Sequence, residues 1–80
     1  MLKVNMEYRS KTLFVNIMGS LDKRNIKKIK TKINYIINEY GIGTIRLDLT
    51  QISFIDVFEF EKMIDDYNMI YGNKIEVIGI

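Results

Sequence analysis

Apolar residues occupy every second position along two stretches near the start of the chain, 2–8 and 12–18. In the second stretch the apolar positions are Leu13, Val15 and Ile17. A period of two residues is typical of half-buried strands. Arg9-Ser10-Lys11 separates the stretches and supplies a turn, so the pattern predicts a β-hairpin.

The period changes to three and four residues between Lys23 and Tyr40, which predicts an amphipathic helix. Asp22 is placed to cap its start, and Gly41 is placed to end it in a left-handed conformation. The apolar stripe consists of Ile26, Ile29, Ile33, Ile36, Ile37 and Tyr40. The other faces carry the cations Lys23, Arg24, Lys27, Lys28, Lys30 and Lys32.

A second pair of elements follows. The apolar residues Ile45, Leu47 and Leu49 predict a buried strand that ends around Asp48, followed by a short loop anchored by Ile52, Phe54 and Ile55. Asp56 then caps a second helix over 57–71. Its inward residues are predicted to be Val57, Phe60, Met63, Ile64, Tyr67 and Ile70, and its acidic outer residues Glu59, Glu61, Asp65 and Asp66. Gly72-Asn73 is expected to close this helix, and 74–80 to form a last strand.

The elements therefore run β-β-α-β-α-β in one α/β domain over 1–80. The two strand–helix–strand units require parallel strands with right-handed crossovers, whereas the hairpin adds an antiparallel strand. The expected architecture is a mixed sheet with helices packed on it.

Composition narrows the chemistry. The 80 residues include neither cysteine nor histidine, which excludes disulfides, thiolate or imidazole metal ligands and Ser-His or Cys-His nucleophiles. The net charge of +2 does not by itself indicate nucleic-acid binding, and no stretch is long and apolar enough to enter a membrane. The abundance of isoleucine, lysine and asparagine is typical of an AT-rich, bacterial genome, and we expect a cytoplasmic protein without a cofactor.

Two charged groups have alternative interpretations. Asp22, Asp48 and Asp56 fall near the carboxyl ends of strands, where carboxylates can hold Mg²⁺, but helix capping already explains two of them. We favour capping, expect no metal site, and expect no catalysis because no base, nucleophile and oxyanion donor come together. The lysines of the first helix can bind nucleic acid, but a solvated face or an acidic protein partner is the preferred reading.

Three motifs carry a resemblance to a known family: Gly19-Ser20-Leu21-Asp22, Leu47-Asp48-Leu49 and Phe54-Ile55-Asp56. In this order and spacing they resemble the STAS domain of bacterial anti-sigma-factor antagonists. The resemblance implies a STAS-like fold and a non-enzymatic regulatory function through protein–protein contact. The implied partner is an anti-sigma factor of the serine-kinase-like ATPase type, or a transport ATPase subunit.

The chain departs from that family at two places. Val57 stands where the family has its phosphorylated Ser or Thr, so no phosphorylation is expected there. Thr50 and Ser53 lie upstream of that position, and we favour local hydrogen bonding over phosphorylation for their hydroxyls. After its fourth strand the chain also lacks the family's usual C-terminal helix–strand–helix. We expect the last strand to be a sheet edge, which is unprotected in a minimal version of the fold or is covered by a partner or by a second copy in a homodimer.

The partner-binding surface expected from the resemblance comprises Ser53, Asp56, Val57, Phe58 and Glu59, with Asp22 and Arg24 beside them. Phe58 is either an exposed interface anchor or a lid that folds back over Ile55 or covers the shortened side of the sheet. The rival interpretation is a small structural subunit or homodimer that shares only the fold, or a fixed subunit of a transport ATPase.

Overall fold

The computed structural model describes residues 2–41, 43–71 and 74–79, with the backbone alone for Ile70, Tyr71 and Lys74. Its first element is the predicted hairpin, in which β1 (Leu2–Arg9) pairs antiparallel with β2 (Thr12–Leu21). Ser10 and Lys11 form the two-residue turn with φ of 50° and 62°. Two left-handed residues in succession match the right-handed twist of the flanking strands.

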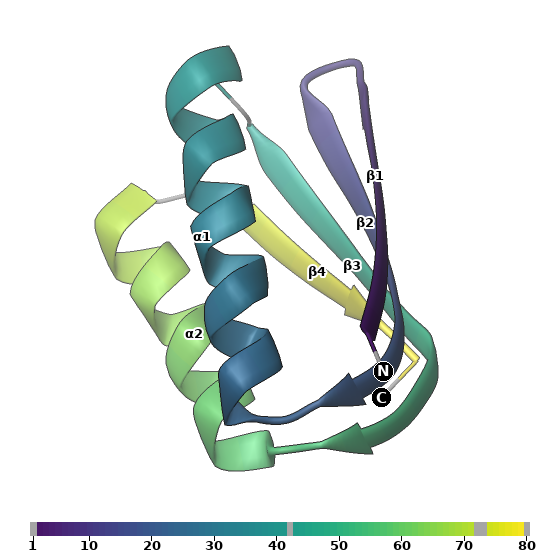
Figure 1. The fold of residues 1–80 in the computed structure, drawn as a ribbon. Coiled ribbons are helices and arrows are strands. Elements are labelled where there is room, and N and C mark those ends of the chain that lie inside the picture. Colours follow the sequence, from purple (N-terminus) through teal and green to yellow (C-terminus); the bar gives the residue numbers. More distant parts are fainter. Residues whose placement is uncertain (1, 42, 72–73, 80) are drawn as a thin grey trace.

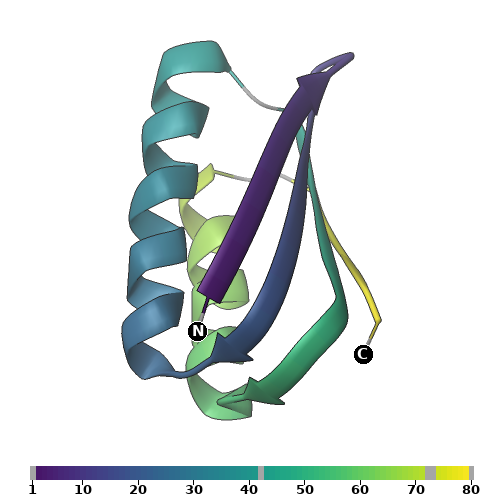
Figure 2. The same cartoon turned by 45° about the vertical axis from the view of Figure 1, so that its right-hand side comes forward.

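The sheet has four strands in the order β1-β2-β3-β4, with β3 (Thr44–Ile55) parallel to both β2 and β4 (Lys74–Ile78). The helices α1 (Lys23–Tyr40) and α2 (Val57–Tyr71) both cover one face of this sheet and leave the other face open (Figures 1 and 2). The predicted element order and mixed sheet are confirmed.

The core lies between the two helices and the sheet, and its members come from β2, α1, β3 and α2. They are Leu13, Val15, Ile17, Leu21, Ile26, Ile29, Ile33, Ile37, Ile45, Leu47, Leu49, Phe60, Met63 and Tyr67. Ile36 is only partly buried, and Tyr40 is exposed, contrary to the predicted stripe. Tyr40 lies in the last turn of α1, beyond the core, where its ring faces that of Tyr8 at a centroid separation of 6.0 Å.

The strand β3 is longer than predicted, because the expected loop after Asp48 is a continuation of the strand to Ile55. Two register shifts against β2 explain the difference. Asn16 and Met18 pair with Asp48 and Gln51, and the adjacent Gly19 and Ser20 pair with Ile52 and Phe54. Each shift places one extra residue in β3, which is the definition of a β-bulge.

The bulges also overturn the expected burial of Phe54, which is 55% exposed. Its backbone pairs with Ser20, between the helix-facing pairs of Gly19 with Ile52 and Leu21 with Ile55. Because successive side chains of a strand point to opposite faces, Phe54 points away from the helices.

The end of α1 is as expected: Gly41 has φ of 63° and its N–H donates to the carbonyl of Ile37 at 3.1 Å. The predicted inward position of Ile70, the closure by Gly72-Asn73 and the end of the last strand at Ile80 fall outside the described side chains and residues. In the described part of the chain, neither helix has the length and apolar character needed to cross a membrane.

Candidate interaction surface

The starts of the two helices lie side by side at one end of the molecule (Figure 1). They are adjacent because β2 and β3 are parallel neighbours that end together, with Leu21 paired to Ile55. The amide of Asp56 donates to the carbonyl of Leu21 at 2.8 Å, immediately before α2. The two strand-to-helix turns therefore form one continuous surface.

Both turns carry an aspartate cap, as predicted. Asp22 Oδ1 accepts from the amide of Asn25 at 2.8 Å, and Asp56 Oδ1 accepts from the amide of Glu59 at 3.1 Å. These bonds satisfy backbone donors that a first helical turn leaves free, and the carboxylates sit at the positive ends of the helix dipoles. The caps account for both side chains structurally.

Asp48 lies within β3 rather than at a strand end, so it stands apart from the two caps in its role. Its Oδ1 accepts from the amide of Thr50 at 3.0 Å and from the hydroxyl of Thr50 at 2.8 Å. These two bonds, the backbone one first, lower the pKa of Asp48 below its ordinary value of 3.8. Among the described residues, no three carboxylates gather as a metal-binding group.

Apolar side chains project from the start of α2. Phe58 is 72% exposed, which contradicts the alternative of a lid folded over Ile55. Val57 is 55% exposed, contrary to its predicted inward position, whereas Phe60 is buried as predicted. Residues 57 and 58 occupy the first turn, where the helix projects past the end of the core, and Phe60 is the first residue of α2 to reach the helix–sheet interface.

We name this region the turn surface: Asp22, Arg24, Ser53, Phe54, Asp56, Val57, Phe58 and Glu59. Ser53 is exposed and is the extra residue of the second bulge. Arg24 is exposed, and Glu59 faces Lys23 across the two helices at 3.9 Å between Nζ and Oε1. Sequence reasoning missed Phe54 as a surface residue, although the three-residue spacing of Leu49, Ile52 and Ile55 is a signal of bulges.

The helix α1 carries an uneven share of charge. It holds six cations and one carboxylate, which leaves −3 on the remainder of a chain with net charge +2. Lys23 faces Glu59, and Lys30 Nζ lies 2.7 Å from Asp66 Oδ2 on α2. The other cations, Arg24, Lys27, Lys28 and Lys32, line a hollow together with Thr31.

An apolar groove runs between α2 and the edge strand β4. It has a volume of about 390 Å³ and is lined by Ile55, Val57, Phe60, Glu61, Ile64, Asp65 and Val77. Val77 and Ile78 are 38% and 43% exposed. Val57 belongs both to this groove and to the turn surface, so the two regions are continuous.

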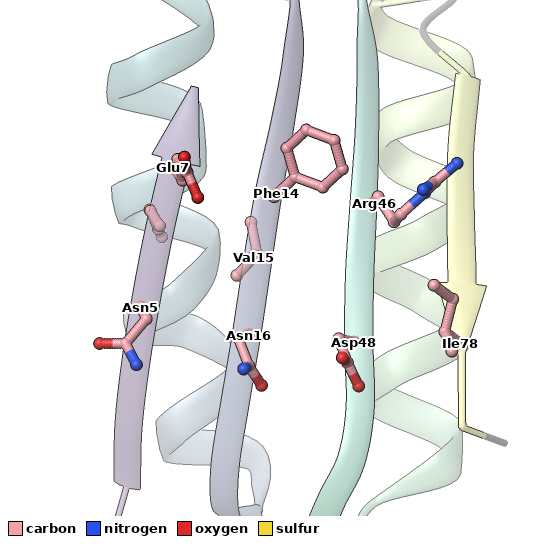
Figure 3. Close-up of a pocket in the computed structure, with 9 residues that line it drawn as sticks. Asn5, Glu7, Phe14, Val15, Asn16, Arg46, Asp48 and Ile78 are labelled. Carbon is pink, nitrogen blue, oxygen red and sulfur yellow. The ribbon is translucent and has the colours of Figure 1, made fainter. Parts of the chain in front are cut away.

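The open face of the sheet forms a further hollow of about 610 Å³, built by side chains of all four strands (Figure 3). Strand register arranges the side chains in and beside this hollow in two rows across the open face of the sheet. The first row is Glu7, Phe14, Arg46 and Glu76, and the second is Asn5, Asn16, Asp48 and Ile78. Sequence reasoning did not find these rows, because they depend on which strands pair and in which register.

A four-stranded mixed sheet with two helices on one face, in the order β-β-α-β-α-β, is the arrangement of the SpoIIAA-like fold. The family model of the STAS domain matches residues 3–77, and the chain belongs to the STAS family. The resemblance and the fold inferred from the sequence are both confirmed.

Three solved structures illustrate the likeness. The anti-sigma factor antagonist SpoIIAA in its unphosphorylated form is 18% identical with a TM-score of 0.72, and the match covers 94% of this chain and 71% of that one. The antisigma-factor antagonist STAS domain from Rhodobacter sphaeroides is 10% identical with a TM-score of 0.74, covering 98% and 86%. Mglu is 17% identical with a TM-score of 0.75, covering 91% of this chain and 18% of that one. At these identities the likeness shows the fold alone.

Proposed function

We propose that this chain is a non-enzymatic regulatory module of the anti-sigma-factor-antagonist type, which binds a protein partner through the turn surface. It works in the cytoplasm of a bacterium, without a cofactor or metal. The partner is an anti-sigma factor of the kinase-like ATPase type, or the subunit of a transport ATPase that receives a STAS domain.

The single observation that carries the proposal is the exposure of Phe58 at 72%, in the first turn of α2. An aromatic ring held in solvent by a helix is a typical interface anchor. Val57 and Phe54, both 55% exposed, extend the apolar centre, and the carboxylates of Asp22 and Asp56 supply a polar border. Such an apolar centre with a polar rim is the usual anatomy of a protein interface.

Regulation differs from that of a phosphorylated antagonist. Val57 has no hydroxyl to accept a phosphate, and Thr50 Oγ1 is engaged with Asp48. We therefore propose that binding is constitutive, or is controlled by protein abundance or by the nucleotide state of the partner.

The test is affinity capture from a lysate of the source organism, with tagged wild type and Phe58→Ala compared by quantitative mass spectrometry. Wild type is expected to capture a kinase-like ATPase or a transport ATPase subunit, and Phe58→Ala is expected to lose it while remaining folded. Tyr35→Ala is the matched control, because Tyr35 is 64% exposed on α1, away from the turn surface. Equal capture by wild type and Phe58→Ala would exclude the turn surface as the interface.

A second candidate function is self-association as a structural subunit, and the observation that favours it is the edge of β4. Val77 is exposed in the apolar groove, Ile78 is exposed on the open face of the sheet, and an edge strand offers unpaired backbone groups to another strand. Val77→Lys places a charge on that edge. Sedimentation equilibrium tests the candidate: a wild-type dimer that becomes monomeric with Val77→Lys supports it, and a monomeric wild type rejects it.

A further inference from the structure

The two rows on the open sheet face differ in how their charges are matched. In the first row, Arg46 lies against Glu76, with Nη2 and Nε at 2.8 Å and 2.9 Å from Oε2. Glu7 Oε1 lies 3.2 Å from Nε of Arg9. The centroid of the Phe14 ring lies 4.6 Å from the guanidinium carbon of Arg9 and 5.5 Å from that of Arg46. Each carboxylate in this row has a cation.

The second row has no such balance within the described residues. Asp48 forms no ion pair there, and its two hydrogen bonds with Thr50 both end on Oδ1. Asn16, which pairs with Asp48 in the sheet, has a buried Oδ1 that accepts no hydrogen bond. A buried acceptor without a donor is unfavourable. The Oδ1 of Asn16, which has no donor, and the carboxylate of Asp48, whose hydrogen bonds come from Thr50, therefore lie at paired positions of neighbouring strands.

The surroundings of these acceptors define what fits between them. Asn5 and Asn16 lie on paired positions of β1 and β2, and Ile78 lies beside Asp48 on β4 (Figure 3). The side chain of Asn16 turns about a soft terminal torsion, so its Oδ1 can reach a donor in the hollow. The complementary ligand therefore has N–H donors, a positive charge and a short apolar part.

We propose that the second row binds a small organic cation bearing N–H donors, an alkylguanidinium or a primary alkylammonium. Its head lies between Asn16 and Asp48, and its alkyl part faces Ile78. The cations already held in the first row show that this face of the sheet accommodates guanidinium groups. The site is on the sheet face opposite the helices, so it does not depend on the proposed protein partner.

The experiment is a titration of the isotope-labelled chain with ethylguanidinium chloride at constant ionic strength, followed through the side-chain amide signals of Asn5 and Asn16. Tetramethylammonium has the charge without N–H donors, and ethylurea has donors without the charge. Saturable shifts with ethylguanidinium alone are expected. Absence of saturation, or equal shifts with tetramethylammonium, would overturn the proposal.

Asp48→Asn removes the charge and keeps the shape of the side chain. The affinity of this variant for ethylguanidinium is expected to fall about tenfold or more, because a hydrogen bond to a charged group is stronger than one to a neutral group. Glu61→Gln makes the same charge change on the exposed surface of α2 and is expected to keep the affinity. Unchanged affinity in Asp48→Asn would overturn the proposal.

If Asp48→Asn does not fold, a pH titration of the wild type tests the same contact. The carboxyl carbon signal of Asp48 reports its protonation as the pH is lowered, while the charged groups around it, Lys3, Glu7, Arg46 and Glu76, are followed in the same spectra. Affinity is expected to fall in step with protonation of Asp48. Affinity that persists after this carboxyl is neutral would contradict the assignment.

Discussion

The backbone amide of Asp56 donates a 2.8 Å hydrogen bond to the carbonyl of Leu21, which joins the start of α2 to the end of β2. Leu21 is fully buried and directly precedes the cap of α1. One bond thus fixes the two turns relative to each other. A preorganised surface loses little conformational entropy on binding, which suits a docking site.

Removal of either helix cap is expected to weaken the fold modestly. Asp22→Ala and Asp56→Ala each lose one side-chain bond to a first-turn amide, and such losses typically cost about 1 kcal/mol. Urea unfolding measures the change. Asp65→Ala, an exposed change on α2, is the control and is expected to stay within about 0.5 kcal/mol of wild type.

Two phenylalanines two residues apart are expected to behave in opposite ways. Phe60 is 6% exposed, so Phe60→Ala should cost about 3–5 kcal/mol of unfolding free energy. Phe58 is 72% exposed, and Phe58→Ala should change it by no more than about 0.5 kcal/mol. Thermal melts of the two variants measure this contrast. A large loss of stability in Phe58→Ala would mean that its ring supports the fold rather than an interface.

Substitutions of Val57 should separate binding from folding. Val57 is 55% exposed, so both Val57→Ser and Val57→Glu are expected to remain folded by circular dichroism. Val57→Glu adds a negative charge beside Asp56 and Glu59, and is expected to reduce partner capture at least about tenfold, as like charges at an interface do. Val57→Ser is expected to keep binding. Full capture by Val57→Glu would place the interface elsewhere.

The pKa of Asp48 gives a prediction for acidic pH. Thr50 stabilises the ionised carboxyl and lowers its pKa in the folded chain. This group therefore adds stability above pH 3.8, and the contribution is lost as the pH falls from there through the lower pKa of the folded state. Thr50→Val removes the hydroxyl bond and is expected to raise the pKa toward its ordinary value. The carboxyl carbon signal measures it, and an unchanged pKa would mean that the backbone bond alone is sufficient.

Two glycines with positive φ allow a matched comparison. Gly41 has φ of 63° with open space around it, so Gly41→Ala bears only the left-handed backbone cost, about 1–2 kcal/mol. Gly79 has φ of 96°, and an added Cβ would lie 2.7 Å from the backbone nitrogen of Thr50. Gly79→Ala is therefore expected to destabilise more than Gly41→Ala in urea unfolding. The reverse order would show that the strand end moves away freely.

The sequence predicted most of the fold because its elements follow regular periods. The stripe of isoleucines in α1, the aspartate caps at Asp22 and Asp56, and Gly41 at the helix end all act within a few residues of chain. Local patterns of this kind can be recognised without knowing which strands are neighbours.

The predictions from the sequence are wrong where contacts between distant segments, rather than local patterns, decide the structure. Beyond Asp48 the apolar residues are spaced by three rather than two, which does not match the period of a regular strand. Only the pairing with β2 identifies this segment as a strand with bulges. Val57 belongs to the apolar pattern of the second helix and was expected to face inward, but it is exposed because the core does not extend to the first turn of α2. The expectation of an exposed Phe58 was correct as one of two alternatives, and only the packing of Phe60 could choose between them.

The two bulges of β3 also determine how the chain tolerates changes in length. Ser53 is the extra residue of the second bulge, so a strand that loses it can still pair Ile52, Phe54 and Ile55 with Gly19, Ser20 and Leu21 and keep each side chain on its present face. A residue lost from the regular part of the strand, such as Leu47 opposite Val15, would instead turn every later side chain to the opposite face of the sheet. A single-residue deletion at Ser53 is therefore expected to be much less severe than a deletion at Leu47.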